Sequence, residues 1–135
     1  MSQTYVDSSA LVKLIVDESE TDALRRFVVS AGPLTSSILA TVEVSRAVAR
    51  VAPGSMADVA AVIQALNVLA FDARIAARAA ALGPVGLRTL DAIHLATALE
   101  LGHELTAFVT YDDRLSAAAR DLGLPVVAPA ESPAG

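Results

Sequence analysis

Four acidic side chains stand in apolar segments that lie far apart along the chain. They are Asp7, Glu43, Asp91 and Asp112. A carboxylate among apolar neighbours is costly unless it meets a cation, a metal ion or a strong hydrogen-bond donor. Hard divalent ions such as Mg²⁺ and Mn²⁺ take oxygen ligands of this kind and can activate water for the hydrolysis of a phosphodiester. The four acids therefore indicate a metal site, provided that the fold brings them together.

The segment around Asp91 is the most informative of the four. Residues 90–96 read Leu-Asp-Ala-Ile-His-Leu-Ala, which predicts a helix too hydrophobic for a solvated surface. At helical spacing, Asp91 shares a face with Leu95 and Ala98. His94 lies nearly one turn after Asp91. We expect it to pack between helices, with a supporting contact to the acids as the alternative.

The other three acids also have ordinary structural interpretations. Asp7 and Asp112 each follow a predicted strand and precede a predicted helix, where an acid often caps the helix. Asp113 competes with Asp112 for that position. Glu43 could pair with Arg46 at i,i+3 on a solvated helix face, an interaction worth roughly a few tenths of a kcal/mol. The joint placement of the acids is therefore a stronger argument than any one of them.

The composition limits the classes of protein that fit. A chain of 135 residues with 54% hydrophobic and 4% aromatic residues predicts one domain with an aliphatic core. The lack of cysteine excludes a disulfide framework, Cys-ligated zinc and thiol catalysis. No signal peptide and no uncharged apolar run of about 18 residues is visible, so we expect a cytoplasmic protein without a membrane span. The net charge of −5 argues against a general nucleic-acid coat.

Arginine dominates the basic residues and offers candidate phosphate contacts. Arg46 and Arg50 stand at i,i+4 on the helix predicted to carry Glu43, and Arg114 is close to Asp112. A guanidinium binds phosphate through two parallel hydrogen bonds, so these three arginines are candidate phosphate contacts. A solvated helix face explains Arg46 and Arg50 equally well, and a GC-rich coding bias also enriches arginine.

Predicted strands and helices alternate along the sequence. The strands are expected at residues 4–6, 34–36, 67–71, 107–110 and 125–127. The helices are expected at residues 10–16, 18–31, 38–51, 55–66, 72–82, 88–101 and 114–122. This order predicts an α/β fold, a three-layer α/β/α sandwich with a mostly parallel sheet. We expect one domain over residues 1–128 and a flexible tail over 129–135. Ligands of such sheets bind at the carboxyl ends of the strands, where Asp7 and Asp112 are predicted to lie.

Four motifs, taken together, resemble a known family. They are Tyr-Val-Asp-Ser-Ser-Ala-Leu over residues 5–11, Thr-Val-Glu-Val over 41–44, the Asp91 segment over 90–96, and Val-Thr-Tyr-Asp over 109–112. In order, spacing and total length this set resembles a PIN domain. More narrowly, it is similar to the VapC toxins of bacterial toxin–antitoxin pairs. The resemblance covers nearly the whole chain, and the segment 90–96 is its most specific part.

The resemblance implies an Mg²⁺- or Mn²⁺-dependent endoribonuclease whose products carry 5′-phosphate and 3′-hydroxyl ends. The residues that match the family's catalytic and metal-binding acids are Asp7, Glu43, Asp91 and Asp112. It also implies that Ser8 and Thr110 support the site by holding a carboxylate or a metal-bound water. A PIN-like fold, a homodimer and a cognate antitoxin whose C-terminal segment blocks the active site are further implications.

Other classes fit the sequence less well. A receiver-like signalling domain needs a lysine near the end of a late strand, whereas the only lysine, Lys13, falls in the first predicted helix. A phosphatase of the haloacid dehalogenase type needs an acid two residues after Asp7, where Ser9 stands. A dinucleotide-binding module needs a G-x-G-x-x-G motif, which is absent. A PIN-like module that binds RNA or protein without catalysis remains an alternative.

Overall fold

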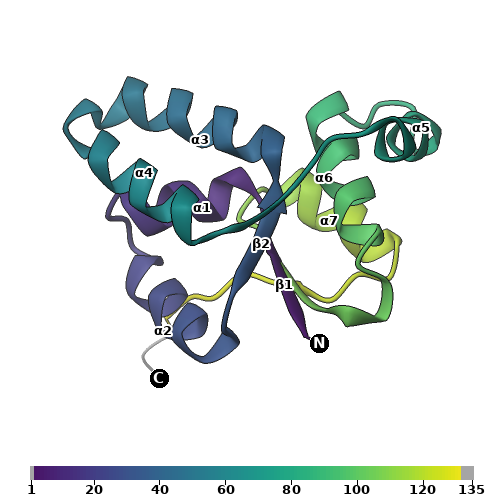
Figure 1. Ribbon diagram of the computed structural model, residues 1–135. Helices are drawn as coiled ribbons and strands as arrows, with labels where there is room; N and C mark the ends of the chain where they lie inside the picture. Colours follow the sequence, from purple (N-terminus) through teal and green to yellow (C-terminus); the bar gives the residue numbers. More distant parts are fainter. Residues whose placement is uncertain (1, 132–135) are drawn as a thin grey trace.

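The computed structural model describes residues 2–131, and its elements follow the predicted alternation (Figure 1). The strands are β1 (Gln3–Val6), β2 (Leu34–Ser37), β3 (Asn67–Leu69), β4 (Leu105–Val109) and β5 (Val126–Val127). The helices are α1 (Ser8–Ile15), α2 (Thr21–Ala31), α3 (Ile38–Val51), α4 (Met56–Ala65), α5 (Ala73–Ala81), α6 (Thr89–Leu99) and α7 (Asp113–Asp121). Two short 3₁₀ turns, η1 (Pro53–Ser55) and η2 (Gly102–Glu104), precede α4 and β4. The predicted elements are all present, with their ends shifted by a few residues.

The five strands form one parallel sheet in the order β3-β2-β1-β4-β5. The predicted three-layer α/β/α class is thereby confirmed. The central pair, β1 and β4, places Val6 opposite Val109. Because parallel strands run in the same direction, the residues that follow Val6 and Val109 leave the sheet side by side. The register therefore makes Asp7 and Thr110 neighbours.

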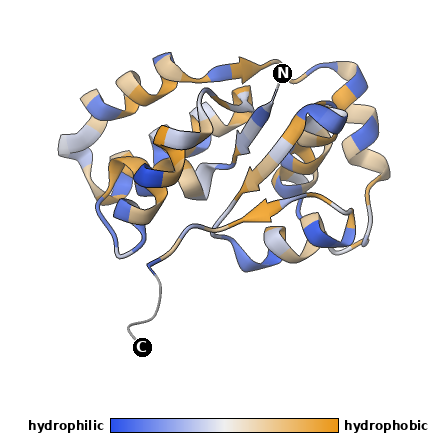
Figure 2. Cartoon of the chain, turned by 90° about the horizontal axis from the view of Figure 1, so that it is seen from below, coloured by the Kyte–Doolittle hydropathy of each residue, from blue (hydrophilic) through white to orange (hydrophobic). Residues whose placement is uncertain are grey.

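Helices cover both faces of the sheet (Figure 1). The helices α1, α2, α3 and α4 pack on one face, and α6 and α7 pack on the other, with α5 against α6. Figure 2 shows hydrophilic and hydrophobic residues alternating around the helices, as expected where one side of a helix faces a core. Within residues 2–131, no helix is long and apolar enough to cross a lipid bilayer.

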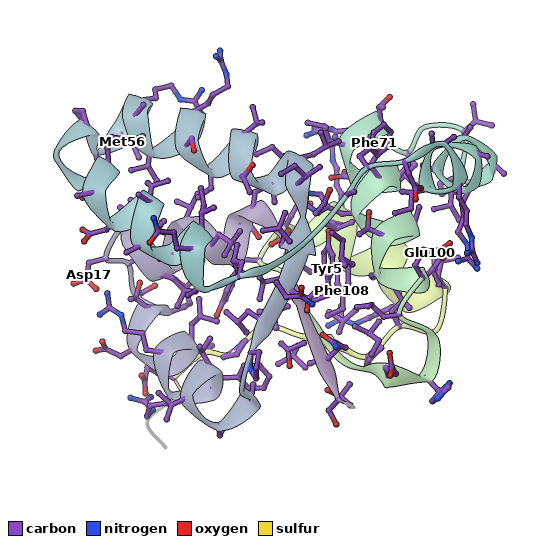
Figure 3. The ribbon with its side chains drawn as sticks, in the orientation of Figure 1. Tyr5, Asp17, Met56, Phe71, Glu100 and Phe108 are labelled. Carbon is purple, nitrogen blue, oxygen red and sulfur yellow. The ribbon has the colours of Figure 1, made fainter. Side chains whose placement is uncertain are left out.

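The side chains of β1 alternate between the two cores. Val6 packs toward α1, α3 and α4, whereas Tyr5 packs toward α6 and α7. The Tyr5 ring stacks on Phe108, with centroids 5.2 Å apart and planes 6° from parallel, at the centre of the molecule (Figure 3). Helix α6 is buried continuously from Ala92 to Ala98, because α5 packs on it as well as the sheet. This burial explains the unusual hydrophobicity of the Asp91 segment.

Residues 129–131, at the start of the predicted tail, contact the domain. The Tyr111 hydroxyl donates a hydrogen bond to the Pro129 carbonyl (2.6 Å), and Arg26 forms an ion pair with Glu131. Residues 132–135 of the predicted tail lie outside the described residues.

We expect Phe108→Ala to destabilise the fold strongly, because Phe108 is fully buried and stacks on Tyr5. Removing a buried Phe side chain costs about 3–5 kcal/mol of unfolding free energy, which urea denaturation would measure. The control is Val29→Ala on the surface of α2, where the side chain is 86% exposed. A loss below about 1 kcal/mol for Phe108→Ala would contradict the described core.

Candidate active site

A cleft of about 330 Å³ at the carboxyl edge of the sheet is lined by all four acids that the sequence analysis identified. Asp7 follows β1, Glu43 is on α3, Asp91 is in the first turn of α6, and Asp112 precedes α7. The remaining residues that line the cleft are Ser8, Ser9, Arg88, Thr89, Leu90, His94 and Leu115. The fold thus gathers the acids from four separate elements.

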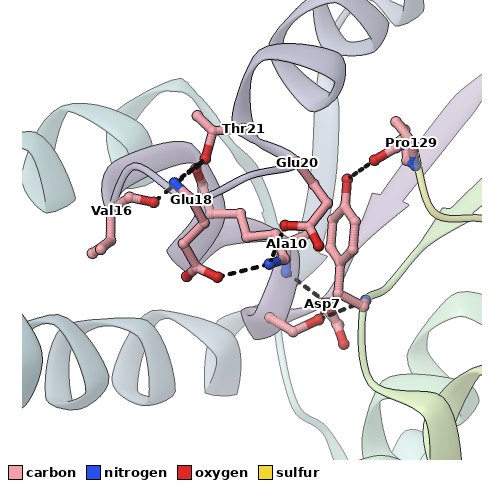
Figure 4. A network of polar contacts seen from close by, with 10 residues as sticks. Asp7, Ala10, Val16, Glu18, Glu20, Thr21 and Pro129 are labelled. Atoms are coloured by element: carbon pink, nitrogen blue, oxygen red, sulfur yellow. Dashed lines mark hydrogen bonds and ion pairs between the residues drawn. The ribbon is translucent and has the colours of Figure 1, made fainter. Parts of the chain in front are cut away.

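Asp7 is the most deeply buried of the acids, with 2% of the residue exposed. Its Oδ1 accepts hydrogen bonds from Ser9 Oγ (2.7 Å) and from the Ala10 N–H (3.0 Å), so Asp7 caps α1 (Figure 4). Its Oδ2 accepts a hydrogen bond from Thr110 Oγ1 (2.6 Å) across the β1–β4 register. Burial raises the pKa of Asp7, although these hydrogen bonds act in the opposite direction. Asp7 can therefore cap α1 and line the acid cleft at the same time.

The hydroxyl groups around Asp7 differ in part from the sequence expectation. Thr110 holds the carboxylate, but the serine that does so is Ser9 rather than Ser8. Ser8 lines the cleft, and the Ser9 hydroxyl also accepts the N–H of Tyr111 (2.9 Å). Two serines follow Asp7 in the sequence, and only the helix geometry decides which one turns back toward the carboxylate.

Asp91 and Asp112 lie close enough to repel each other. Burial raises the pKa of Asp91, and the nearby charge of Asp112 raises it further. Asp112 caps α7 by accepting the Leu115 N–H (2.9 Å), and its own N–H donates to Thr110 Oγ1 (3.1 Å). Asp113, the alternative to Asp112, is exposed and is not among the residues that line the cleft.

Glu43 contacts His94 rather than Arg46. His94 Nε2 lies 2.7 Å from Glu43 Oε1, and His94 Nδ1 lies 2.6 Å from the Tyr5 hydroxyl. Arg46 forms no ion pair with any residue between 2 and 131. The i,i+3 interpretation of Glu43 was therefore wrong. His94 does pack inside the fold, but it also makes the supporting contact that the sequence left as the alternative.

The donor set suits a hard cation. In the described part of the chain, no Lys or Arg forms an ion pair with any of the four acids. As the side chains stand, no three His, Asp or Glu residues of 2–131 are arranged to hold one ion. Asp7, Glu43 and Asp112 each accept a hydrogen bond from the protein. A carboxylate oxygen has two lone pairs, so these oxygens can still bind a cation. The oxygen chemistry and the excess of negative over positive side chains in the cleft fit Mg²⁺ or Mn²⁺.

The arginines divide into three groups. Arg88, which the sequence analysis did not select, lines the acid cleft and lowers the pKa of Asp91 against the raising effect of burial. In the sequence, its position directly before the helix that carries Asp91 was the feature that could have identified it. Arg46 and Arg50 line a larger adjacent cavity of about 710 Å³. Arg114 is exposed and lines neither cavity, so its contact with phosphate stays a prediction.

The adjacent cavity opens beside the acid cleft and shares Ser8, Ser9, Glu43 and Leu90 with it. Lys13 lies on its wall, 4.8 Å from the centroid of the Tyr111 ring. Lys13 donates hydrogen bonds to Glu18 (2.8 Å) and Glu20 (3.0 Å), two residues labelled in Figure 4. Partial burial lowers the pKa of Lys13, but these two carboxylates outweigh it and the net shift is upward. The charge of Lys13 is therefore largely compensated, whereas Arg46 and Arg50 form no ion pair within residues 2–131.

Comparison with known proteins agrees with this geometry. The family profile described as the PIN domain matches residues 4–121. The chain is 46% identical over 129 residues to Ribonuclease VapC46 of Mycobacterium tuberculosis, covering 96% of this chain and 99% of the relative. The protein belongs to the PIN-domain family, in the group of the VapC ribonucleases.

Solved structures share the fold. The crystal structure of Mycobacterium tuberculosis VapC20, a toxin that cleaves the sarcin-ricin loop, matches with a TM-score of 0.77 at 19% identity, covering 94% of this chain and 100% of VapC20. A toxin–antitoxin complex from Klebsiella pneumoniae matches with a TM-score of 0.74 at 23% identity, covering 96% of this chain and 100% of the matched chain. At these identities the likeness concerns the fold.

The raised pKa of Asp7 predicts how stability depends on pH. Its pKa in the folded state lies above the unfolded value of about 3.9. Between these two values the folded state binds more protons, so the free energy of unfolding falls as pH rises through that range. We expect the Tm of the metal-free protein in EDTA to fall more steeply above about pH 4 than that of Asp7→Asn, which keeps a capping side chain. If Tm fell equally steeply with pH in both proteins, the result would contradict a raised pKa of Asp7 in the folded state.

A divalent ion should counteract this loss of stability. Binding to the folded state alone adds about 2.7 kcal/mol of unfolding free energy when the free ion reaches a hundred times its Kd. We therefore expect Mn²⁺ to raise the Tm of the wild type at neutral pH, and to raise that of Asp7→Asn much less. Thermal unfolding with increasing Mn²⁺ would measure both. Equal responses would mean that the ion binds away from Asp7.

Proposed function

We propose that this protein is a metal-dependent endoribonuclease and the toxin of a type II toxin–antitoxin pair. The observation that carries the proposal is the convergence of Asp7, Glu43, Asp91 and Asp112 on one cleft, where no Lys or Arg of residues 2–131 forms an ion pair with them. The 46% identity to a protein named Ribonuclease VapC46 supports RNA as the substrate. The likeness in fold to a chain of a toxin–antitoxin complex is consistent with a cognate antitoxin. Membership of the same family also supports a homodimer.

The acids would hold Mg²⁺ or Mn²⁺, with Asp7 and Asp91 as direct ligands and Glu43 and Asp112 completing the set. When bound, such an ion supplies an activated water and neutralises charge on the phosphodiester. Without it, the cleft is strongly negative and would repel the RNA backbone. The ion is therefore needed for productive binding of RNA as well as for hydrolysis, which would leave 5′-phosphate and 3′-hydroxyl ends.

The protein's own contribution is to fix the acids before substrate arrives. Asp7 is held by Thr110, Ser9 and the Ala10 N–H, so its carboxylate has little freedom to reorient. Preorganised polar groups of this kind avoid reorganisation during the reaction. Arg88 stands at the cleft, and Arg46 and Arg50 stand at the adjacent cavity, where they can contact phosphates on either side of the scissile bond.

A PIN-like module that binds without catalysis is the second candidate. Such a module would have no need to retain four acids in one cleft, because burying and gathering carboxylates lowers stability. A receiver-like domain is not supported, because Lys13 is engaged by Glu18 and Glu20 and does not line the acid cleft.

We expect the purified protein to cleave a structured RNA pool with Mg²⁺ or Mn²⁺ and not with EDTA. Asp7→Asn and Asp91→Asn should each lower the rate by about 100-fold or more, because even groups that only support a metal ligand are worth about 10–100-fold. The matched control is Asp58→Asn, an exposed acid on α4. Mass spectrometry must first show that no antitoxin is retained. Equal cleavage by wild type and Asp7→Asn would point to a contaminating nuclease and reject the proposal.

The double substitution of Arg46 and Arg50 by Ala should weaken RNA binding. Each lost phosphate contact reduces the dependence of log K on log salt by roughly 0.7 for single-stranded RNA. We expect a higher KM, a shallower salt dependence and little change in kcat. Arg120→Ala, at an exposed position in the last turn of α7, is the control. An unchanged salt dependence in the double variant would mean that both arginines lie on a solvated helix face and do not contact RNA.

A further inference from the structure

A buried chain of hydrogen bonds connects the centre of the sheet to the acid cleft. It runs from the Tyr5 hydroxyl on β1 to His94 Nδ1 on α6 (2.6 Å), and from His94 Nε2 to Glu43 Oε1 on α3 (2.7 Å). The His94 side chain is 3% exposed and that of Glu43 is 25% exposed. Three elements therefore meet through one imidazole, and both His94 and the more exposed Glu43 line the cleft.

The direction of the hydrogen bonds follows from the groups involved. A phenol has an ordinary pKa of about 10, so the Tyr5 hydroxyl carries its proton at neutral pH. The Tyr5 hydroxyl then donates to His94 Nδ1. A neutral imidazole that accepts at Nδ1 carries its proton on Nε2, which is the atom that faces Glu43. One tautomer of His94 thus satisfies both contacts.

The partners of Glu43 in this chain have little freedom to move. Tyr5 belongs to the central strand, stacks on Phe108 and meets the His94 ring edge-on at a centroid distance of 5.8 Å. His94 lies in the continuously buried part of α6. Glu43 has a long side chain that would otherwise sample several rotamers. Its Oε2 makes no hydrogen bond to residues 2–131, so the anchored Oε1 leaves the second oxygen available at the cleft.

We propose that His94 is a positioning residue of this site: it orients the Glu43 carboxylate toward the cleft, and Tyr5 selects the tautomer that does so. This inference rests on the proposed metal-dependent nuclease function. It adds that α6 serves the site twice, because Asp91 supplies an acid and His94, three residues later, orients an acid on another helix. His94 lines the cleft with only 3% of its side chain exposed, so in this role it acts through Glu43 and not as a ligand of the ion.

Three variants test this role. His94→Leu fills the space without a donor, His94→Gln keeps an N–H donor at a comparable distance, and Tyr5→Phe keeps the ring stack and removes only the hydroxyl. We expect His94→Leu to lower both the Mn²⁺ affinity, measured by titration calorimetry without RNA, and kcat by about 10–100-fold, with little change in KM for RNA at saturating Mn²⁺. His94→Gln should recover most of both losses, and Tyr5→Phe should fall between wild type and His94→Leu.

A purely structural role of His94 makes different predictions. It would lower Tm without a separate effect on Mn²⁺ affinity, and Gln would rescue no better than Leu. Either result overturns the inference. Circular dichroism shows whether His94→Leu folds. If it does not fold, the Mn²⁺ affinity and kcat of Tyr5→Phe are compared with those of the wild type instead. ¹⁵N NMR of the imidazole gives an independent readout, because the proton is expected on Nε2, and a proton on Nδ1 would overturn the assigned direction.

A double-mutant cycle with Glu43→Ala shows whether His94 acts through Glu43. We expect that His94→Leu adds little further loss of Mn²⁺ affinity or kcat once Glu43 is removed, because residues that act as a unit are not additive. Fully additive losses overturn the inference and leave the nuclease proposal intact. A wild-type protein that neither binds Mn²⁺ nor cleaves RNA overturns both.

Discussion

Gathering carboxylates at one edge of the sheet is the electrostatic constraint on which the rest of this structure depends. Asp7 is almost fully buried, and Asp91 and Asp112 repel each other across the cleft. No ion pair within residues 2–131 offsets these charges. Such an arrangement lowers the stability of the metal-free protein, because both Asp7 and Asp91 would be more easily accommodated as neutral acids. The surrounding fold must therefore hold the acids in place against their own repulsion.

The fold meets this constraint with contacts made deep in the molecule rather than at the surface. The β1–β4 register delivers Thr110 to Asp7, and helix capping ties Asp7 to α1 and Asp112 to α7. The same carboxylates thus begin helices and line the cleft, so rigidity of the scaffold becomes rigidity of the site. The arginines proposed to contact RNA, which are Arg88, Arg46 and Arg50, are arranged differently. All three are exposed, with Arg88 in the lining of the acid cleft and Arg46 and Arg50 in the lining of the adjacent cavity.

Much of this arrangement is predictable from local sequence. Hydrophobic periodicity located the strands and helices, including α3 at its observed bounds, because helices and strands impose different spacings on the residues they bury. The four acids were found because each interrupts an apolar segment. The order of the strands was not predicted, since a parallel connection can place the next strand on either side. The ends of the elements were predicted less accurately. Glu18 was expected in a helix but precedes α2, and Phe71 was expected in a strand but follows β3.

The sequence by itself determined the fold class, the acidic set and the family, because residue type, periodicity and motif order are local properties. Only the tertiary structure decided which neighbours those acids have. Ser9 rather than Ser8 turns toward Asp7, and His94 rather than Arg46 holds Glu43. Arg88 lines the cleft, whereas Arg114 does not. Each of these choices depends on the packing of α6 over the sheet or on the direction of a helix turn. Such contacts join residues distant in sequence, and no local pattern encodes the distance between them.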